Sequence, residues 1–270
     1  MRLGIGSYTY TWAIGVPGRM PACPLTAREL LERAAALGLR VVQFCDNLPL
    51  TRLGPADLDE FERYAREHRL AIEIGTRGMD PGNLLAHLAL ARRFGAPFLR
   101  LVVDSTGHEP TPEEVVESLH ALLPQFRDAG VKLALENHDR FASRTLARIV
   151  DELGADEAGV CLDTVNSFGA LEGPELVVGT LAPYTLNLHV KDFIIRRVSS
   201  QMGFIVEGCP AGRGRLNLPW LLEELRAAGR DPNAILELWT PFAHSLELTM
   251  AREEAWARES ISRLRQLIPD

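Results

Sequence analysis

Eight short apolar segments alternate with longer helical patterns along the whole chain, and this alternation limits the fold more than any other feature. Each segment is mostly apolar or β-branched and is bounded by Gly, Pro, Asn or Asp, as is typical of strands buried on both faces. Strands that alternate with helices form parallel sheets with right-handed crossovers. The predicted strands are Leu3–Gly6, Val41–Phe44, Ala71–Ile74, Phe98–Val103, Lys132–Glu136, Gly159–Leu162, Thr185–Val190 and Ile235–Leu238.

The segments between the predicted strands carry apolar residues at helical spacing. Leu30, Leu31 and Ala34 illustrate this spacing, because residues three or four positions apart share one face of a helix. Thr26 precedes that face as a candidate N-cap, and Gly38 follows it, where a left-handed cap favours glycine. Similar start and stop residues flank other segments, so we expect a helix between successive strands.

Eight strand–helix units in 270 residues predict an α/β fold of the (β/α)8 class, a TIM barrel. A doubly wound open sheet is the alternative, but it would carry a GxGxxG turn after its first strand. Gly4 and Gly6 lie within the first predicted strand, and no third glycine completes that motif. No shift in composition marks a linker. We therefore predict a single domain over residues 1–270, with one long functional loop at Met202–Arg215.

Composition disfavours several classes of partner. Acidic residues outnumber basic residues 36 to 29, which gives a formal charge of −7 and disfavours nucleic-acid binding. The four cysteines are scattered without a CxxC pair, so neither a disulfide framework nor a structural zinc module is expected. The first residues lack a signal-peptide pattern, and no apolar run approaches the roughly 18 residues of a membrane span. We therefore predict a cytoplasmic protein with no membrane partner.

Four polar residues stand at or beside the ends of apolar segments: Glu136, Asp163, His189 and Glu237. Such positions meet at the active-site rim of a barrel, because its strands are parallel. Each residue alone could be a helix cap or an ion-pair partner. Three carboxylates and an imidazole on four successive strands, however, would be costly to bury unless a cation lay between them. We predict a divalent metal site, and this ligand set favours Mn²⁺, with Mg²⁺, Co²⁺ or Zn²⁺ as alternatives.

The sequence around these residues resembles the metal-site strands of a known superfamily. The segments ENHDRF, CLDTVNSFG, HVKDF and LELW are similar to those of sugar isomerases and epimerases with the xylose-isomerase-like barrel. That superfamily includes ketose 3-epimerases, hydroxypyruvate isomerase, inosose dehydratase and endonuclease IV-type repair enzymes. The resemblance implies that Glu136, Asp163, His189 and Glu237 hold the metal. It also implies that Glu136 and Glu237 are catalytic, one removing a substrate proton and the other returning a proton on the opposite side.

Two positions depart from the pattern of this superfamily. Asn166 stands where many members have a histidine that contacts substrate or, in repair enzymes, zinc. Arg213 stands where many members have an acidic residue, and this indicates an anionic substrate that carries a carboxylate or a phosphate. The alternative is that Arg213 and its neighbouring arginines are solvated at the surface. The missing histidine and the negative net charge disfavour DNA repair.

Several further residues are predicted to contact the substrate. Arg100 lies in an apolar strand, where burial demands a partner, so it would pair with Glu73 or Glu136 or touch the substrate. Lys191 lies two residues after His189, so its side chain should point to the same inner side of the barrel, because side chains alternate along a strand. The predicted substrate-binding set is His138, Asn166, Lys191, Arg100, Arg197 and Arg213.

Four functions are compatible with these residues. The first is a metal-dependent isomerase or epimerase of a small ketose or sugar acid that works through an enediolate. The second is a decarboxylase of a 3-oxo sugar acid on the same metal site, because loss of CO₂ from such an acid also yields an enediolate. A non-catalytic sugar-binding barrel and an endonuclease IV-like repair enzyme are less favoured. We expect a sugar or sugar acid as partner and no nucleic acid, and leave a homodimer or homotetramer open.

Overall fold

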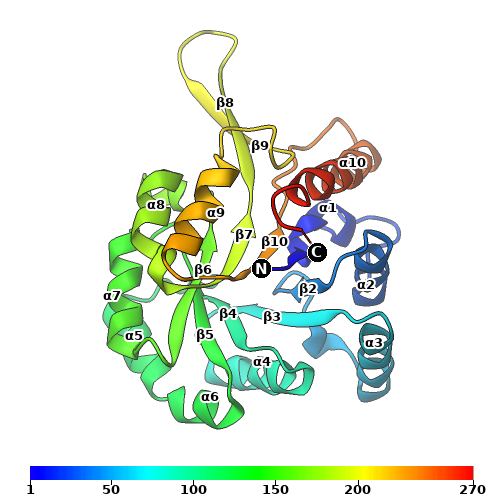
Figure 1. The fold of residues 1–270 in the computed structure, drawn as a ribbon. Coiled ribbons are helices and arrows are strands. Elements are labelled where there is room, and N and C mark those ends of the chain that lie inside the picture. Colours follow the sequence, from blue (N-terminus) through cyan, green and yellow to red (C-terminus); the bar gives the residue numbers. More distant parts are fainter. Residues whose placement is uncertain (270) are drawn as a thin grey trace.

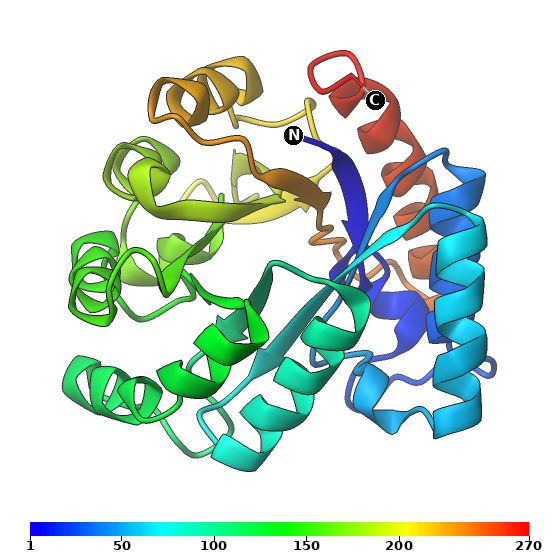
Figure 2. The ribbon, with the colours of Figure 1, turned by 60° about the horizontal axis from the view of Figure 1, so that its bottom comes forward.

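The computed structural model describes residues 1–269, and within this range the chain forms the predicted TIM barrel. Parallel strands close a ring in the order β1-β10-β7-β6-β5-β4-β3-β2, which Figure 2 shows with the helices around it. Strand β3 extends beyond its predicted end, and β10 begins two residues before its predicted start. The barrel strands are β1 (Leu3–Gly6), β2 (Val41–Phe44), β3 (Ala71–Arg77), β4 (Phe98–Val102), β5 (Lys132–Glu136), β6 (Ala158–Asp163), β7 (Thr185–Val190) and β10 (Asn233–Leu236).

Helices cover the outside of the barrel (Figure 1). The predicted N-cap Thr26 is confirmed, because its side chain accepts a hydrogen bond from the backbone N–H of Glu29. No helix in the described part of the chain is long and apolar enough to cross a membrane. The α-helices are α1 (Thr11–Ile14), α2 (Ala27–Ala36), α3 (Pro55–Glu67), α4 (Pro81–Phe94), α5 (Pro112–His120), α6 (Leu123–Ala129), α7 (Ser143–Leu153), α8 (Pro174–Leu181), α9 (Leu218–Ala227) and α10 (Leu246–Leu264). Short 3-10 helices span Ser7–Thr9, Leu50–Arg52, Asn166–Ala170 and Ala182–Tyr184.

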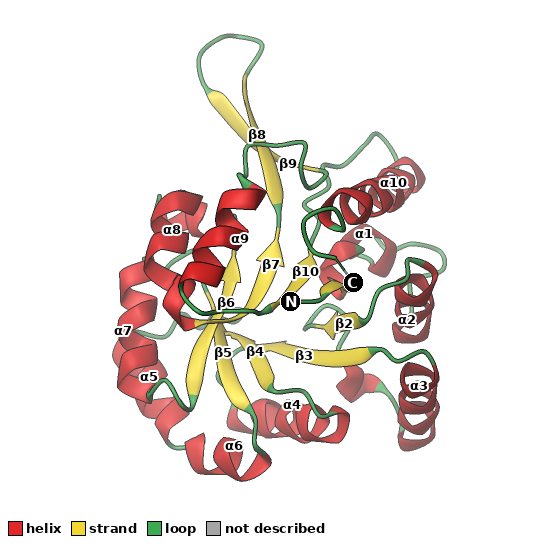
Figure 3. Ribbon diagram, in the orientation of Figure 1, coloured by secondary structure: helices red, strands yellow, loops and turns green. Residues whose placement is uncertain are grey.

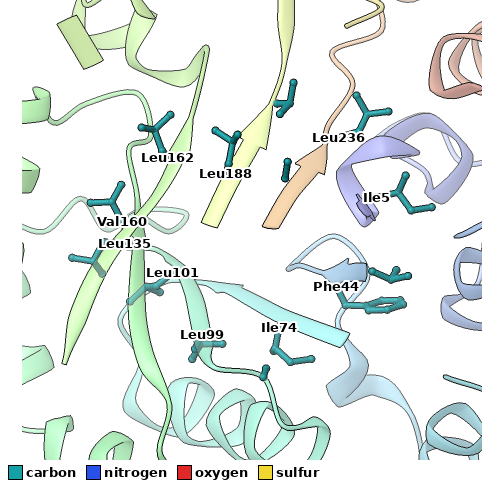
Figure 4. Close-up of a cluster of buried hydrophobic side chains, with 14 of the residues drawn as sticks. Ile5, Phe44, Ile74, Leu99, Leu101, Leu135, Val160, Leu162, Leu188 and Leu236 are labelled. Carbon is teal, nitrogen blue, oxygen red and sulfur yellow. The ribbon is translucent and has the colours of Figure 1, made fainter. Parts of the chain in front are cut away.

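The main hydrophobic core is a ring between the barrel and the helices. Side chains alternate along each strand, so every second residue points outward. The outward residues Ile5, Phe44, Leu99, Leu135 and Leu188 are buried in this ring (Figure 4). Full burial of one such side chain stabilises the folded state by about 1.5–3 kcal/mol. The ring therefore supplies most of the apolar burial that holds the barrel closed.

The inside of the barrel has a different composition. Gln43, Glu73, Asn187 and His189 are almost completely buried there, on the strand faces opposite the apolar ring. A small apolar cluster that includes Phe98 completes the interior. The strands are buried on both faces, as predicted, but only the outer face is consistently apolar. The polar inner face positions the candidate site.

The prediction of one long loop over Met202–Arg215 is wrong, because part of this segment is a strand. Strand β8 (Asp192–Arg197) follows β7 directly and pairs antiparallel with β9 (Phe204–Cys209). The hairpin projects from the barrel in Figures 1 and 3. At its base, the Asp192 carboxylate accepts hydrogen bonds from the backbone N–H groups of Gly212, Gly214 and Leu216, which fixes the loop that leads to α9.

Candidate metal and substrate site

The structure brings the four predicted ligands together at the carboxyl ends of neighbouring strands. Glu136 ends β5, Asp163 ends β6, His189 lies in β7, and Glu237 follows β10; all four are buried. His189 Nδ1 lies 3.3 Å from Glu136 Oε2 and 3.2 Å from Glu237 Oε1. Asp163 Oδ2 lies 3.9 Å from the same nitrogen. The imidazole nitrogen is therefore surrounded by carboxylate oxygens from three other strand ends.

The unsatisfied atoms of this cluster fit a cation. His189 Nδ1, Glu237 Oε1 and Asp163 Oδ2 are buried without a hydrogen-bond partner, although Lys191 Nζ forms an ion pair with Asp163 Oδ2 at 2.9 Å. One ligand atom from each of these three residues lies within 4.8 Å of the others. Leaving a buried polar atom unpaired costs about 1–3 kcal/mol. A divalent cation held by these atoms would remove that cost, so the residues fit the predicted metal.

Cys161 could complete a second ligand set with Glu136 and His189, because their ligand atoms are equally close. Burial, however, raises the pKa of the Cys161 thiol well above its ordinary value. Its sulfur also lies 3.4 Å from Asn187 Oδ1, as a thiol donor to that oxygen. A protonated thiol is a poor metal ligand. Asp163 and Glu237 are therefore the better partners of His189.

A hydrogen bond on the far side of the ring fixes the tautomer of His189. Its Nε2 lies 2.7 Å from Gln43 Oε1, and because an amide oxygen only accepts, Nε2 carries the hydrogen. Nδ1 then keeps its lone pair, and this lone pair faces the carboxylates. The Gln43 amide nitrogen donates in turn to Glu73 Oε2 at 3.1 Å and to Asn187 Oδ1 at 2.9 Å. The ring is therefore oriented for metal ligation by residues that do not touch the metal.

Glu73 anchors this buried network from the floor of the site. Its carboxylate accepts from Gln43, from Asn187 at 3.1 Å and from Asn233 at 2.7 Å. Burial raises its pKa, while the amide donors oppose that rise. Sequence reasoning missed Gln43 and gave Glu73 only as an alternative partner of Arg100. Both are polar residues at inward positions of apolar strands, the same signal that selected Arg100.

Arg100 pairs with Glu136 and not with Glu73, which settles one alternative left open by the sequence. The Arg100 Nε donates to Glu136 Oε2, and its Nη1 lies 3.2 Å from Asp46 Oδ1. Asn166 Nδ2 donates to the other Glu136 oxygen at 2.8 Å. Burial would raise the pKa of Glu136, but the cationic side chains of Arg100 and Lys191 hold it far below its usual range. Glu136 therefore stays ionised and is a weak base.

Lys191 reaches into the cluster, as its strand parity predicted. Its Nζ lies 2.9 Å from both Asp163 Oδ2 and Glu237 Oε2, and 3.2 Å from Asn166 Oδ1. Burial would lower the pKa of Lys191, but the surrounding carboxylates outweigh burial and raise it above its ordinary value. Lys191 and Arg100 then balance two of the three carboxylates. A bound divalent cation would change the remaining negative charge of the site into a positive one.

A cavity of about 450 Å³ opens above this cluster, and we call it the mouth cavity. Lys191 and Asn166 line its polar side, while Trp12 and Trp239 line its apolar side, together with Tyr8. Trp239 is 41% exposed, so one wall of the cavity is in contact with solvent. A small polar molecule in this cavity would meet the ammonium of Lys191 beside the candidate metal ligands.

His138 lies at the rim, at the edge of the site. Its Nε2 lies 3.1 Å from Arg77 Nη2, and its Nδ1 lies 3.0 Å from Asp139 Oδ2. Arg77 also pairs with Asp46, which accepts a hydrogen bond from the Tyr8 hydroxyl at 2.9 Å. The rim is therefore a connected chain of polar side chains, and Arg77, Asp46 and Tyr8 are members that sequence reasoning missed.

The structure does not bring Arg197 and Arg213 to the site, so these two predictions are corrected. Arg197 lies on the projecting hairpin, where its guanidinium stacks over Phe204 and donates to the Gln201 carbonyl. Arg213 is exposed and pairs with Glu259 of α10. The hairpin carries the first arginine away from the barrel, and the loop fixed by Asp192 turns the second toward α10. The predicted surface alternative holds for Arg213.

Residues 31–267 match the family described as Xylose isomerase-like TIM barrel. The chain belongs to this family. The match confirms the resemblance seen around the metal-site segments. The 3-oxo-isoapionate decarboxylase of Pectobacterium atrosepticum is 34% identical to this chain over 264 residues, which cover 98% of this chain and 95% of the decarboxylase. A catalytic relative over nearly the full length agrees with the prediction that the protein is an enzyme.

Solved structures show the same fold. A D-psicose 3-epimerase, solved in the presence of D-fructose, superposes with a TM-score of 0.74 at 14% identity and covers 100% of both chains. The IolI protein, solved with a zinc atom, has a TM-score of 0.67 at 18% identity and covers 97% of this chain and 99% of its own. At these identities the likeness establishes the shared barrel.

Proposed function

We propose that the protein is a metal-dependent decarboxylase of a small 3-oxo sugar acid. The observation that carries this proposal is the full-length similarity to the 3-oxo-isoapionate decarboxylase of P. atrosepticum. The sugar and sugar-acid partners predicted from the sequence include this substrate class. We further propose that the protein acts in the cytoplasm on this small molecule alone, without nucleic acid, as a homodimer or homotetramer.

The charges of the site support an acidic substrate. Glu136, Asp163 and Glu237 face the two cations Arg100 and Lys191, so the cluster with a divalent ion carries one net positive charge. Lys191 also lines the mouth cavity, where its ammonium is accessible to a small molecule. A carboxylate that enters this cavity would gain a charge-assisted hydrogen bond from Lys191. An uncharged ketose would not use this positive charge.

The residues that would hold the metal are Glu136, Asp163, His189 and Glu237. When bound, a divalent ion acts as a Lewis acid that withdraws electron density from a carbonyl group. We propose Mn²⁺ as the resident ion, with Mg²⁺, Co²⁺ or Zn²⁺ as alternatives, because three carboxylates and one imidazole suit these ions. The zinc in the structure of the IolI protein shows that a barrel of this shape accepts a divalent ion.

The proposed reaction breaks the bond between the carboxylate carbon and C2 of the substrate. CO₂ leaves, the bonding electron pair passes toward the 3-oxo oxygen to give an enediolate, and a proton then adds to C2. Lys191 would bind the acid and offset the developing negative charge. Glu237, which lies beside His189 and Lys191, would relay the proton from solvent to C2. Glu136 needs to do no proton transfer, in keeping with its bonds to Arg100 and Asn166.

Epimerisation or isomerisation of a ketose or sugar acid is the second candidate, favoured by the pair of glutamates beside His189. Such a reaction needs one glutamate to remove a proton and the other to return one. Here Glu136 is bound by two donors, and its low pKa makes it a poor proton acceptor. Because Arg100 makes Glu136 a poor base, we consider this function less favoured than decarboxylation.

One pair of assays separates the two functions. The purified protein with Mn²⁺ is incubated with 3-oxo-isoapionate, and CO₂ release is measured; a panel of ketoses in deuterated water is followed in parallel for C–H exchange by NMR. We expect CO₂ release without exchange into the ketoses. Lys191→Met should abolish most of the release, while Arg213→Met, at an exposed position, should not. Exchange without CO₂ release would replace decarboxylation by epimerisation, and a failure of both reactions would reject an enediolate enzyme for these substrates.

A further inference from the structure

A second cavity, of about 720 Å³, lies beside the metal site between the end of β3, helix α4 and helix α5. None of the residues that line it also lines the mouth cavity within the described part of the chain. Tyr8 lines the mouth cavity and Asp46 lines the second cavity, and the hydrogen bond between these two side chains joins the two walls. We call this second space the α4 cavity. It is separate from the candidate metal ligands.

A histidine with an unsatisfied side-chain nitrogen lines the α4 cavity. His87 of α4 is only 4% exposed and lines the cavity, and its Nε2 has no hydrogen-bond partner. Its Nδ1 lies 2.8 Å from the Asn83 carbonyl, so Nδ1 carries the hydrogen and Nε2 bears a lone pair. Burial lowers the pKa of His87, which keeps the ring neutral. The cavity wall therefore holds a buried acceptor without a partner, which a ligand donor group that reached it would satisfy.

The carboxylates and the guanidinium on the cavity wall already have partners. Arg77 Nε lies 3.4 Å from Asp46 Oδ2, and Asp80 caps α4 by accepting from the backbone N–H of Asn83 at 2.7 Å. An ionic ligand would therefore find no unpaired partner there. The rest of the lining includes hydroxyl groups and apolar side chains, among them Thr51, Ser105, Ser118, Met79, Ala121 and Leu122.

We propose that the α4 cavity is a second binding site, for an uncharged polyhydroxylated molecule such as a polyol or a small sugar. One ligand hydroxyl would donate to His87 Nε2, others would bond the wall hydroxyl groups, and the C–H faces would lie against Met79 and Leu122. This ligand would not contact the metal ligands. The proposal goes beyond the decarboxylase function and does not depend on it.

Xylitol is a suitable probe, and NMR of the protein labelled with ¹⁵N-histidine reports on the acceptor directly. In protein treated with EDTA, xylitol should shift the Nε2 resonance of His87 saturably, with a Kd on the order of 1 mM for a ligand of this size. The same shift should appear with Mn²⁺ bound. An unchanged His87 resonance at about 50 mM xylitol, or binding only in the presence of metal, would overturn the proposal.

Matched variants locate the site. Ala121→Phe would fill the cavity from an exposed position, so it should fold normally and weaken xylitol binding at least tenfold. His87→Phe, in which binding is followed by saturation transfer to the xylitol protons, should also weaken binding. His68→Phe should not, although His68 makes the same Nδ1-to-carbonyl bond, to Tyr64, at the C-cap of α3 outside the cavity. Xylitol binding that survives both Ala121→Phe and His87→Phe, or that is lost in His68→Phe, would contradict the proposal. All readouts are independent of catalytic activity.

Discussion

Replacement of Gln43 by leucine should weaken metal binding although Gln43 touches no metal. The substitution removes the acceptor of the His189 Nε2–H, which the wild type holds at 2.7 Å. The ring would then be free to rotate or to move its hydrogen to Nδ1, where the hydrogen would block ligation. Loss of such an orienting partner typically lowers metal affinity by about 10–100-fold, which corresponds to roughly 1.4–2.7 kcal/mol of binding free energy.

The same substitution should also destabilise the metal-free protein. It leaves one buried imidazole N–H without a partner, at about 1–3 kcal/mol, and deprives Glu73 and Asn187 of a donor. Isothermal titration with Mn²⁺ measures the affinity, urea unfolding measures the stability, and ¹⁵N-histidine NMR of the metal-free protein reports the tautomer. The wild type should show the hydrogen on Nε2 of His189.

Asn233→Ala is the matched control for Gln43→Leu. Asn233 donates to Glu73 Oε1 at 2.7 Å, so the control also removes one donor from Glu73, yet its side chain does not contact His189. The control should lose stability and keep its Mn²⁺ affinity. If Gln43→Leu binds Mn²⁺ as tightly as the wild type and keeps the same tautomer, Gln43 does not orient the ring. Equal losses of affinity in both variants would attribute the effect to Glu73.

Three further predictions concern the charges of the molecule. Arg100→Met should leave Glu136 buried without its main partner and lower the unfolding free energy of the metal-free protein by about 3–5 kcal/mol in urea titrations; Arg92→Met at the surface should have no such effect. Burial raises the pKa of Glu253 to about 7 from 4.5, so the folded protein holds a proton that the unfolded chain releases in this range. The unfolding free energy should therefore fall as pH rises from 4.5 to 7, and Glu253→Gln should flatten that slope in urea titrations; an equal slope in the variant would assign the titration to another group. EDTA should lower the thermal midpoint in calorimetry, and Mn²⁺ at 100 times its Kd should restore about 2.7 kcal/mol; an unchanged midpoint with any divalent ion would argue against the metal site.

The barrel and the four candidate ligands could be predicted from sequence because both follow from strand periodicity. Glu136, Asp163, His189 and Glu237 stand at equivalent ends of parallel strands, and closure of the ring makes those ends neighbours. The inward position of Lys191 follows from the same alternation. These inferences need only local pattern and the geometry of a closed sheet.

The remaining contacts depend on partners that are distant in sequence. The hairpin could not be anticipated because Arg196 and Arg197 resemble a solvated loop, although they pair with Ile205 and Phe204 across two strands. Gln43 acquires its role only when β2 and β7 face each other across the barrel. The α4 cavity depends on how the loops after β3 and β4 fold, which periodicity does not determine.

In this barrel, the residues that stabilise the fold and the residues that form the candidate site lie on opposite faces of the same strands. Apolar contacts between the strands and the helices stabilise the barrel, so the residues that line its interior contribute comparatively little to its stability. The amide and carboxylate side chains of the interior can then be replaced by other residues in evolution, while the apolar contacts outside the barrel keep the strands in place. A 14% identical epimerase with the same architecture is what such a division of labour would produce.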